Sequence, residues 1–363
     1  MQFIHQPVQL KNITIKNPII RSATWENLTT PTGHLTNELY EIYENLAKNE
    51  VGLIITGYAF ILQSEQPNPG MMGIYDDSFI EEYQELTKRV HQHGAKIILQ
   101  LAYGGTKTTF NVGQRVIFSP SNIPETSTKT QGQEMTINDI KTVIQAFVDA
   151  SRRAKEAGFD GVQIHGAHTY LLNQFLSPYY NKRTDEYGGS LENRCRIFKE
   201  IITAIHQEIG LDYLVLVKLT CLDFIDDGLH FFETKEICKY IEAYGYDGIE
   251  ITGNVHGKAN TMTNQSFDGH QILKEGYFLE YANVIANLVS IPVMTVGGFS
   301  DPKHIEEVLK TTNIKMISIS RPLMSDPDLV KNWQNKNYIK SRCLHCSKCR
   351  TKIGNYCTVF QNK

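Results

Sequence analysis

The chain has 363 residues, of which 41% are hydrophobic and 21% are charged, and this ordinary globular composition argues against a disordered or fibrous protein. Its formal net charge is -3 and no run of Lys or Arg stands out, so nucleic acid and anionic membranes are poor candidates as partners. Met1–Leu10 lacks the layout of a signal peptide, and no apolar run reaches the ~18 residues of a membrane helix, so we expect a soluble cytoplasmic protein.

Short apolar runs rich in β-branched residues recur along the chain, with helical patterns between them. Most runs are continuously hydrophobic rather than alternating, as is typical of parallel strands buried on both faces. This repeated α/β pattern, without an early break, predicts a closed (β/α)8 TIM barrel rather than an open doubly wound sheet. We expect the strands at Asn17–Ser22, Val51–Gly57, Ala95–Leu101, Phe159–His165, Tyr213–Leu219, Tyr246–Ile251, Ile291–Val296 and Lys315–Ser320.

The segments between these runs show the apolar spacing of amphipathic helices. Ser78, Ser190, Thr234 and Ser300 are predicted as helix N-terminal caps, because their hydroxyl oxygens can accept hydrogen bonds from free backbone amides. The clearest helical patterns are Ser78–His93, Ile137–Ala157, Asn193–Ile209, Thr234–Tyr244 and Asp301–Leu309.

Two long polar segments interrupt this alternation, Ala102–Met135 and Asn254–Gly276. Loops of this length usually carry a function or a small hairpin of their own. Because both segments follow predicted barrel strands, we expect them over the C-terminal face, where barrel enzymes keep their active sites. The first is expected to be a loop or hairpin insertion after the third strand.

Three polar, ring-bearing residues stand at the end of the fourth predicted strand: His165, His168 and Tyr170. Two His side chains can hydrogen-bond one carbonyl or nitro oxygen, and a Tyr phenol can deliver a proton close by. The spacing alone fits a second interpretation equally well, in which one His packs inside the barrel and the Tyr is a rim aromatic.

Lys218 lies within the fifth predicted strand. A Lys inside a barrel strand is typical of Schiff-base aldolases, because burial lowers the pKa of the amine. Gln100 and the His165, His168 and Tyr170 set have no obvious task in that mechanism. A Lys218 aldolase is therefore the alternative function.

The last two predicted strands end in a pattern that favours phosphate binding. Gly297 and Gly298 follow the seventh strand, and Ser320 and Arg321 follow the eighth. Barrels often bind phosphate with backbone amides of these two loops, and an Arg adds a charge-assisted bond. No Gly-x-Gly-x-x-Gly follows any strand, so a nicotinamide cofactor would be a diffusible reductant.

The stretches HGAHTY at 165–170, NQFLSP at 173–178 and RTDEYGGSLENR at 183–194 closely resemble the signature of the old yellow enzyme family, the NADH:flavin oxidoreductase / NADH oxidase group. The resemblance covers about residues 1–335. It implies an FMN-dependent oxidoreductase in which NADH or NADPH reduces the flavin. The flavin then passes hydride to a small acceptor, above all an α,β-unsaturated carbonyl compound.

The same resemblance implies roles for the residues that match it. His165 and His168 would grip the oxygen of the activated alkene, and Tyr170 would protonate its carbon. Gln100 matches the amide that reads the flavin pyrimidine edge. Lys218 stands where the family has a cation near flavin N1 and O2, and either Lys or Arg there would stabilise the reduced, anionic ring.

The resemblance also places FMN against further residues. The ribityl phosphate would lie on the loops of the seventh and eighth strands. The backbone after the first strand would contact the flavin edge, and a small residue after the second strand would lie against the ring. The position that tunes the flavin potential is often Cys or Thr, but here it is Trp25. These cofactor residues are Gly297, Gly298, Ser320, Arg321, Ser22, Ala23, Thr24 and Ala59.

The chain ends in a cysteine-rich segment with Cys343, Cys346, Cys349 and Cys357. A C-x2-C-x2-C run with one more Cys resembles the cluster-binding segment of the dienoyl-CoA reductase and trimethylamine dehydrogenase branch, which holds a [4Fe-4S] cluster. A structural zinc held by four thiolates and a set of free thiols are two further alternatives. We therefore divide the chain into an FMN-binding barrel, 1–340, and a tail, 341–363. A homo-oligomer is left open.

Overall fold

The computed structural model describes residues 1–253, 275–346 and 348–360, and within them eight parallel strands form a closed ring. Each strand pairs with the next along the chain, and the last pairs with the first, Ile319 lying opposite Arg21. The ring consists of β3 (Ile19–Arg21), β4 (Leu53–Ile55), β7 (Lys96–Ala102), β10 (Gly161–Gly166), β11 (Leu214–Thr220), β12 (Gly248–Thr252), β13 (Val293–Val296) and β14 (Met316–Ile319). The predicted (β/α)8 barrel and each of its expected strands are confirmed.

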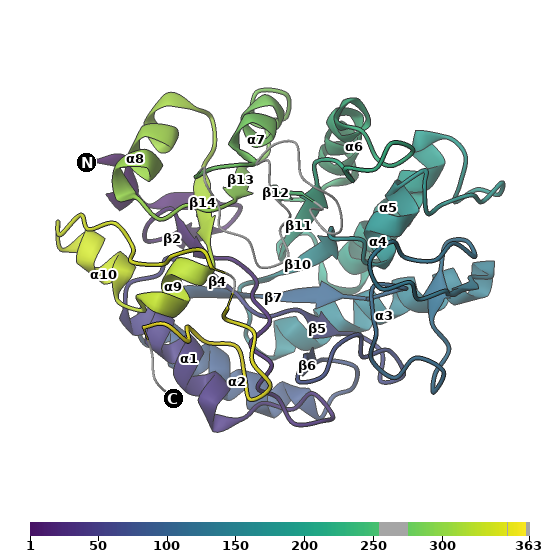
Figure 1. Cartoon of the computed structure of the whole chain (residues 1–363), viewed down its shortest axis with the longest axis horizontal. Coiled ribbons are helices and arrows are strands. Elements are labelled where there is room, and N and C mark those ends of the chain that lie inside the picture. Colours follow the sequence, from purple (N-terminus) through teal and green to yellow (C-terminus); the bar gives the residue numbers. More distant parts are fainter. Residues whose placement is uncertain (254–274, 347, 361–363) are drawn as a thin grey trace.

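Helices surround this ring on its outside (Figure 1). Their apolar faces pack on the strands, as the spacing predicted, and all five expected helices are present. The surrounding helices are α1 (Asn37–Lys48), α2 (Phe79–His91), α3 (Ile137–Glu156), α5 (Leu191–Ile209), α6 (Phe231–Tyr244), α7 (Leu279–Ala286) and α8 (Pro302–Thr311). No helix in the described part of the chain is both long enough and apolar enough to cross a lipid bilayer.

Two of the four predicted helix caps are wrong. Thr234 lies inside α6, where its hydroxyl donates to the Cys221 carbonyl at 2.7 Å. The hydroxyl of Ser300 donates to Glu275 at 2.6 Å, and the adjacent Asp301 caps α8 instead. In both cases the hydroxyl donates its hydrogen bond to a residue distant in the sequence rather than capping the helix. Ser190 caps α5 as predicted, accepting from the Asn193 amide; the fourth predicted cap, at 78, precedes α2 but makes no cap bond.

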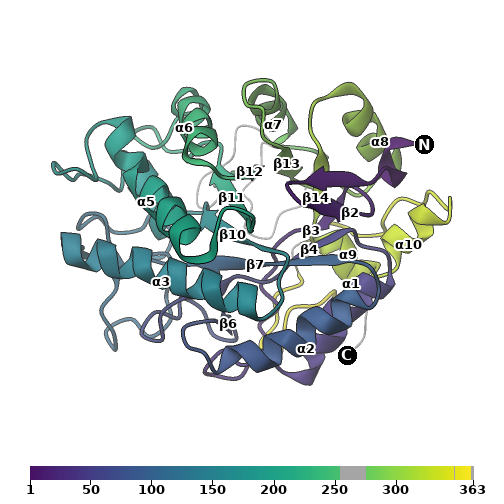
Figure 2. The ribbon, with the colours of Figure 1, turned by 180° about the vertical axis from the view of Figure 1, so that it is seen from behind.

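The N-terminal end of the barrel is filled by apolar side chains and covered by a small antiparallel pair, β1 (Val8–Leu10) and β2 (Ile13–Ile15). This pair lies toward the viewer in Figure 2. We call this layer the apolar end. Its buried members are Leu10, Ile15, Ile20, Leu53, Ile55, Ile98, Leu214, Leu216, Met294 and Met316.

The opposite end carries the long loops. β5 (Ala59–Phe60) and β6 (Met72–Gly73) extend the sheet beside the end of β7. The insertion after β7 contains β8 (Phe118–Ser119) and β9 (Gln133–Glu134), which pair in parallel, so it is a loop rather than a hairpin. The second long segment, Asn254–Gly276, lies outside the described residues except for its last two positions.

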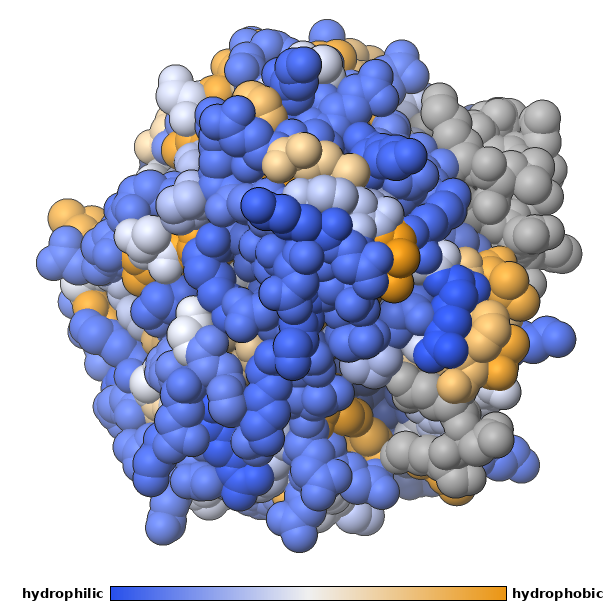
Figure 3. Space-filling view, turned by 90° about the vertical axis from the view of Figure 1, so that its left-hand side faces the viewer, coloured by the Kyte–Doolittle hydropathy of each residue, from blue (hydrophilic) through white to orange (hydrophobic). Residues whose placement is uncertain are grey.

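The cysteine-rich tail follows α9 (Arg321–Ser325) and α10 (Leu329–Gln334) and lies on the viewer's side in Figure 1. It is attached to the loop after β3 because Asn355 donates its backbone amide to the Glu26 carbonyl at 2.7 Å and its side-chain amide to the Trp25 carbonyl at 2.6 Å. The surface on the left of Figure 1 is mostly hydrophilic, with apolar residues scattered or in small groups (Figure 3).

Candidate active site

A continuous polar network occupies the interior of the barrel above the apolar layer, and we call this the polar end. The Gln100 amide donates to Gln163 at 2.6 Å, and the Gln163 amide donates to Glu250 at 2.9 Å. Glu250 forms an ion pair with Lys218 at 3.1 Å, and the Lys218 ammonium also donates to the Ser22 hydroxyl at 3.1 Å. All five side chains are at most 3% exposed.

Strand register builds this network. Gln100 on β7 is aligned with Gln163 on β10, and Lys218 on β11 is aligned with Glu250 on β12. Side chains at aligned positions of neighbouring strands point to the same face, so each pair meets inside the barrel. Our sequence analysis missed Gln163 and Glu250. A charged residue in the otherwise apolar run of β12 was the signal that could have identified Glu250.

Lys218 and Glu250 are a charged pair. Burial alone would raise the pKa of Glu250, but the Lys218 cation and the hydrogen bond from Gln163 outweigh burial and lower the pKa. Lys218 is therefore engaged in an ion pair with a buried carboxylate. A Schiff-base lysine has to react as the neutral amine. The pairing thus opposes the aldolase alternative.

The structure brings His165, His168 and Tyr170 together at the end of β10. The His165 ring meets the Tyr170 ring edge-on at a centroid distance of 4.9 Å, and it lies 5.2 Å from the His168 ring. His168 and Thr169 have φ angles of 60° and 58°, a left-handed turn that folds the chain back after the strand. The ring of His168 also bonds the Thr252 hydroxyl at 3.1 Å.

His165 and Tyr170 are both buried and electrically neutral near pH 7. Burial, together with the Lys218 charge, lowers the pKa of His165 to about 3. Burial raises the pKa of Tyr170 well above the usual value of a phenol. The Nδ1 atom of His165 is buried and has no hydrogen-bond partner. The pair therefore offers a neutral imidazole with a free nitrogen beside a phenol that keeps its proton.

Two residues at this site were missed by our sequence analysis, Tyr58 and Asn68. Tyr58 directly precedes β5, and its ring meets that of Tyr170 edge-on at 5.6 Å. The Asn68 side-chain amide donates to the Tyr170 phenol oxygen at 3.0 Å and to the Tyr58 phenol oxygen at 3.1 Å. Asn68 stands in the loop between β5 and β6, and no motif in its sequence marked it.

The loop after β3 meets the loop after β14 at the rim of the polar end. The Ser22 amide donates to the Ile319 carbonyl at 3.0 Å, and the Thr24 hydroxyl lies 2.8 Å from that of Ser320. Ala23 lies between them and is partly buried. Trp25, the residue that departs from the family pattern, donates its indole N–H to the Pro69 carbonyl at 3.1 Å.

The predicted phosphate residues also lie on neighbouring strands. Gly297 and Gly298 follow β13 with φ angles of 138° and 74°, which are conformations that favour glycine. Arg321 begins α9 directly after Ser320, and its guanidinium donates to the His345 carbonyl at 3.4 Å. A glycine turn after β13 and a guanidinium after the neighbouring strand β14 fit a phosphate group.

These features fit a bound flavin. The network offers an amide at Gln100 and an ammonium at Lys218, and the buried Nδ1 atom of His165 has no hydrogen-bond partner. Ala59 is fully buried in β5, where it pairs with Leu101.

The four tail cysteines are not gathered into a metal site. None forms a disulfide, and burial raises the pKa of the Cys343 and Cys349 thiols, to about 11 for Cys349. Across the described ranges, no group of three or more His, Cys, Asp or Glu side chains is arranged to hold a metal ion. The iron–sulfur cluster and the zinc ion therefore stay predictions.

Comparisons with known proteins identify the family of the chain. Residues 3–339 match the model of the NADH:flavin oxidoreductase / NADH oxidase family. Over 98% of its length the chain is 33% identical to an NADH oxidase of Thermoanaerobacter brockii and 32% identical to a cinnamate reductase of Clostridium sporogenes, covering 54% and 56% of those proteins. The chain thus spans about half the length of the curated relatives it matches.

Two solved structures extend the comparison. A 2-naphthoyl-CoA reductase complex superposes with a TM-score of 0.87 at 25% identity, over 96% of this chain and 54% of that one. An old yellow enzyme homologue of Zymomonas mobilis superposes with a TM-score of 0.80 at 23% identity, over 96% and 97%, which supports the fold. Because the family match concerns flavin oxidoreductases, the aldolase alternative is wrong.

Proposed function

Because the chain belongs to the NADH:flavin oxidoreductase / NADH oxidase family, we propose that it binds FMN and uses NADH or NADPH to reduce a small activated alkene. An α,β-unsaturated carbonyl compound is the expected acceptor. The observation that supports this reaction is the convergence of His165, His168 and Tyr170 above the Gln100–Lys218 network. This arrangement brings hydrogen-bond donors for the acceptor oxygen, the two histidines, next to a proton donor for the alkene carbon, Tyr170.

The flavin would be held by residues from four parts of the barrel. Gln100 and Lys218 would contact the isoalloxazine, and the Lys218 charge would favour its reduced, anionic form. The ring edge would lie along the loop after β3 and against Ala59. Ser22, Ala23 and Thr24 form that loop, and Gly297, Gly298, Ser320 and Arg321 would hold the phosphate. When bound, FMN supplies the hydride chemistry that no side chain can provide.

The protein side chains would orient and polarise the acceptor. His165 is neutral, so a ring N–H can donate to the acceptor oxygen as charge develops on it. His168 would be the second donor. Tyr170 keeps its proton near pH 7 and would deliver it to the alkene carbon. Water reaching the oxygen is limited because His165 and Tyr170 are 3% and 6% exposed.

The tail, residues 341–363, contributes no step to this proposal. Its cysteines are the candidates for a [4Fe-4S] cluster, a zinc ion or free thiols. Analysis of purified protein for iron, acid-labile sulfide and zinc distinguishes these three states. A stoichiometry near zero for all three elements would leave the tail as a purely protein segment.

The decisive experiment is an absorption spectrum followed by rapid mixing. We expect a yellow protein with about one non-covalent FMN per chain, reduced by NADH or NADPH and reoxidised by an enone. The comparison of the two nucleotides identifies the physiological reductant. A colourless protein that takes up no added FMN would contradict the proposal, and so would a reduced flavin that no enone reoxidises.

A further inference from the structure

Two phenols at the site share one amide group. Asn68 donates to the oxygen of Tyr170 at 3.0 Å and to that of Tyr58 at 3.1 Å. A primary amide has two N–H groups, so it can serve both oxygens together. Each phenol oxygen is then an acceptor in this bond. The Tyr170 hydroxyl is also hydrogen-bonded to Tyr58, and that bond raises the pKa of Tyr170, whereas the Asn68 bond lowers it.

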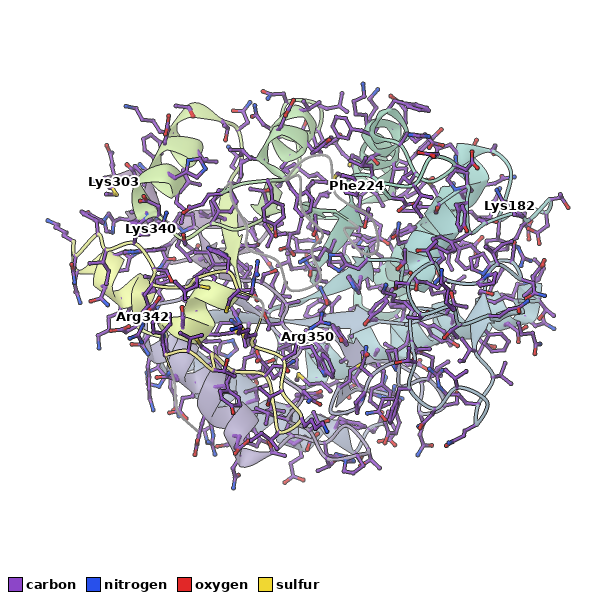
Figure 4. The ribbon with its side chains drawn as sticks, viewed as in Figure 1. Lys182, Phe224, Lys303, Lys340, Arg342 and Arg350 are labelled. Carbon is purple, nitrogen blue, oxygen red and sulfur yellow. The ribbon has the colours of Figure 1, made fainter. Side chains whose placement is uncertain are left out.

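The shared amide belongs to the same cluster as the two histidines. The His165 ring lies 4.9 Å from Tyr170 and is nearly parallel to Tyr58 at 6.4 Å. Burial raises the pKa of Tyr58 to about 12, while the charge of Arg350 acts in the opposite direction. Figure 4 shows Arg350 on the tail, in front of the barrel ring. The tail thus approaches Tyr58, and the Tyr170 ring meets the His165 ring.

The loop that carries Asn68 is held on both sides of that residue. The Thr108 hydroxyl donates to the Pro67 carbonyl at 2.7 Å, and the Trp25 indole donates to the Pro69 carbonyl at 3.1 Å. Proline on either side also restricts the backbone of Asn68. Two other loops therefore hold the loop that carries Asn68 in place before any acceptor binds.

A buried phenol is a poor acid unless its anion is stabilised. Removal of the proton leaves a phenolate, and burial penalises that charge, as the raised pKa of Tyr170 reflects. The Asn68 hydrogen bond acts against this penalty, because an N–H group binds an anionic oxygen more strongly than a neutral one. The stabilisation of the Tyr170 oxygen by Asn68 therefore increases as the proton leaves.

We propose, on the basis of the function above, that Asn68 is a positioning residue for the proton donor: its amide orients Tyr170 and stabilises the phenolate formed in the step. Hydride from the reduced flavin adds to one alkene carbon. The Tyr170 O–H bond breaks, a C–H bond forms at the neighbouring carbon, and the negative charge moves to the phenol oxygen. A proton from water then restores Tyr170.

The test compares Asn68→Asp and Asn68→Leu with the parent holoenzyme in stopped-flow reoxidation by an enone and by a quinone. Asp keeps the shape of Asn, but as a carboxylate it has no donor. We expect both variants to lose about 10-fold or more in enone reduction, the usual size for a bond to a charged group, with little change in KM. Quinone reduction, which needs no carbon protonation, stays within a few-fold.

The pH profile separates donation from shape. A protonated Asp carboxyl can donate a hydrogen bond, so Asn68→Asp should regain enone reduction as the pH falls, whereas Asn68→Leu should not. The matched control is Asn49→Asp, which makes the same chemical change at the C-terminal end of α1. Equal losses with both acceptors, or full activity of Asn68→Asp at neutral pH, would overturn the inference.

The double variant Asn68→Asp/Tyr170→Phe adds a second criterion. If Asn68 acts through Tyr170, the double variant is no slower with the enone than Tyr170→Phe alone. Fully additive losses would overturn the inference. A parent enzyme that reduces no enone would instead sink the proposed function and this inference together. Selective loss in Tyr170→Phe without loss in Asn68→Asp would sink this inference alone.

Discussion

The two ends of the barrel use the same strands for different purposes. On β11, Leu216 faces the apolar end and Lys218, two residues later, faces the polar end. Leu216 packs with Leu214 and Met294, whereas Lys218, the next side chain of β11 that points into the barrel, pairs with the buried Glu250 carboxylate. The difference teaches that the barrel is stabilised at one end, so that the other end can hold buried polar groups in fixed positions.

The largest effect is expected when both histidines proposed to bind the acceptor are removed from the polar end. Each lost bond to a developing oxyanion costs about 2.7–4 kcal/mol in the transition state. We therefore expect His165→Ala/His168→Ala to slow enone reduction severely and to weaken binding of phenolic ligands, while reduction of the flavin by NADH or NADPH suffers less. Separate measurement of the two half-reactions checks this. Unchanged steady-state enone reduction would refute the assignment of both histidines.

Tyr170→Phe sharpens the comparison within the polar end itself. The substitution removes one hydroxyl, so packing and flavin binding should persist. We expect a loss of about 10²–10⁴-fold in enone reduction, the usual span for a positioned general acid. Turnover with a quinone or oxygen should stay within a few-fold of the parent, because these acceptors need no protonation at carbon. Equal losses with both kinds of acceptor would mean that Tyr170 shapes the site.

Leu216→Ala and Lys218→Met compare the two ends on one strand. Leu216→Ala leaves a cavity and should cost about 2–5 kcal/mol of stability. Lys218→Met leaves the Glu250 carboxylate buried without its cation and should cost about 3–5 kcal/mol. Chemical denaturation measures both losses, and absorbance of the folded fraction measures flavin content. We expect only Lys218→Met to reduce the flavin content.

A repair variant provides the control for this pair. Lys218→Met/Glu250→Leu replaces the ion pair by apolar groups of similar volume, which is often neutral for stability. The double variant should recover the unfolding free energy of the parent, but its flavin content should stay low. Recovery of normal flavin content in the double variant would show that the Lys218 charge is dispensable for the cofactor.

The last prediction concerns the acid dependence of stability. The pKa of His165 is about 3 in the folded protein, against 6.5 for the ordinary residue. A group whose pKa is lowered in the folded protein binds its proton more readily in the unfolded state. The contribution of neutral His165 to the free energy of unfolding is therefore fully present above about pH 6.5. It is lost as the pH falls toward 3, at about 1.4 kcal/mol per pH unit. His165→Phe should have a shallower acid dependence in urea unfolding. Leu216→Ala should keep the slope of the parent, and equal slopes for all three proteins would contradict this account.

The barrel could be predicted because its signal is local. The run of β11, LVLVKLT, is continuously apolar apart from one Lys, and such runs identify buried parallel strands without any knowledge of their neighbours. The failure of the predicted cap at Ser300 could not be foreseen in the same way. Its hydroxyl bonds to Glu275, a residue that reaches it only through tertiary structure.

The site was predictable in part for the same reason. His165, His168 and Tyr170 fall in one short motif at a strand end, so their convergence follows from the strand. The pairing of Glu250 with Lys218 required the register between β11 and β12, which no single strand contains. Asn68 reaches Tyr170 across 102 residues of sequence, from a loop held by two other loops, and its own sequence gives no indication of that contact.

The pairing of β3 with β14 means that the barrel can close only late in the synthesis of the chain. Arg21 lies opposite Ile319, so the ring closes between two strands separated by most of the chain. At a synthesis rate of about 5–20 residues per second, the first strand waits roughly 15–60 s for its second neighbour to leave the ribosome. During that interval β3 has one unpaired edge, and such edges are prone to pair with other chains. Rapid packing of β1, β2 and α1 around β3 would therefore protect the nascent chain from aggregation until β14 emerges.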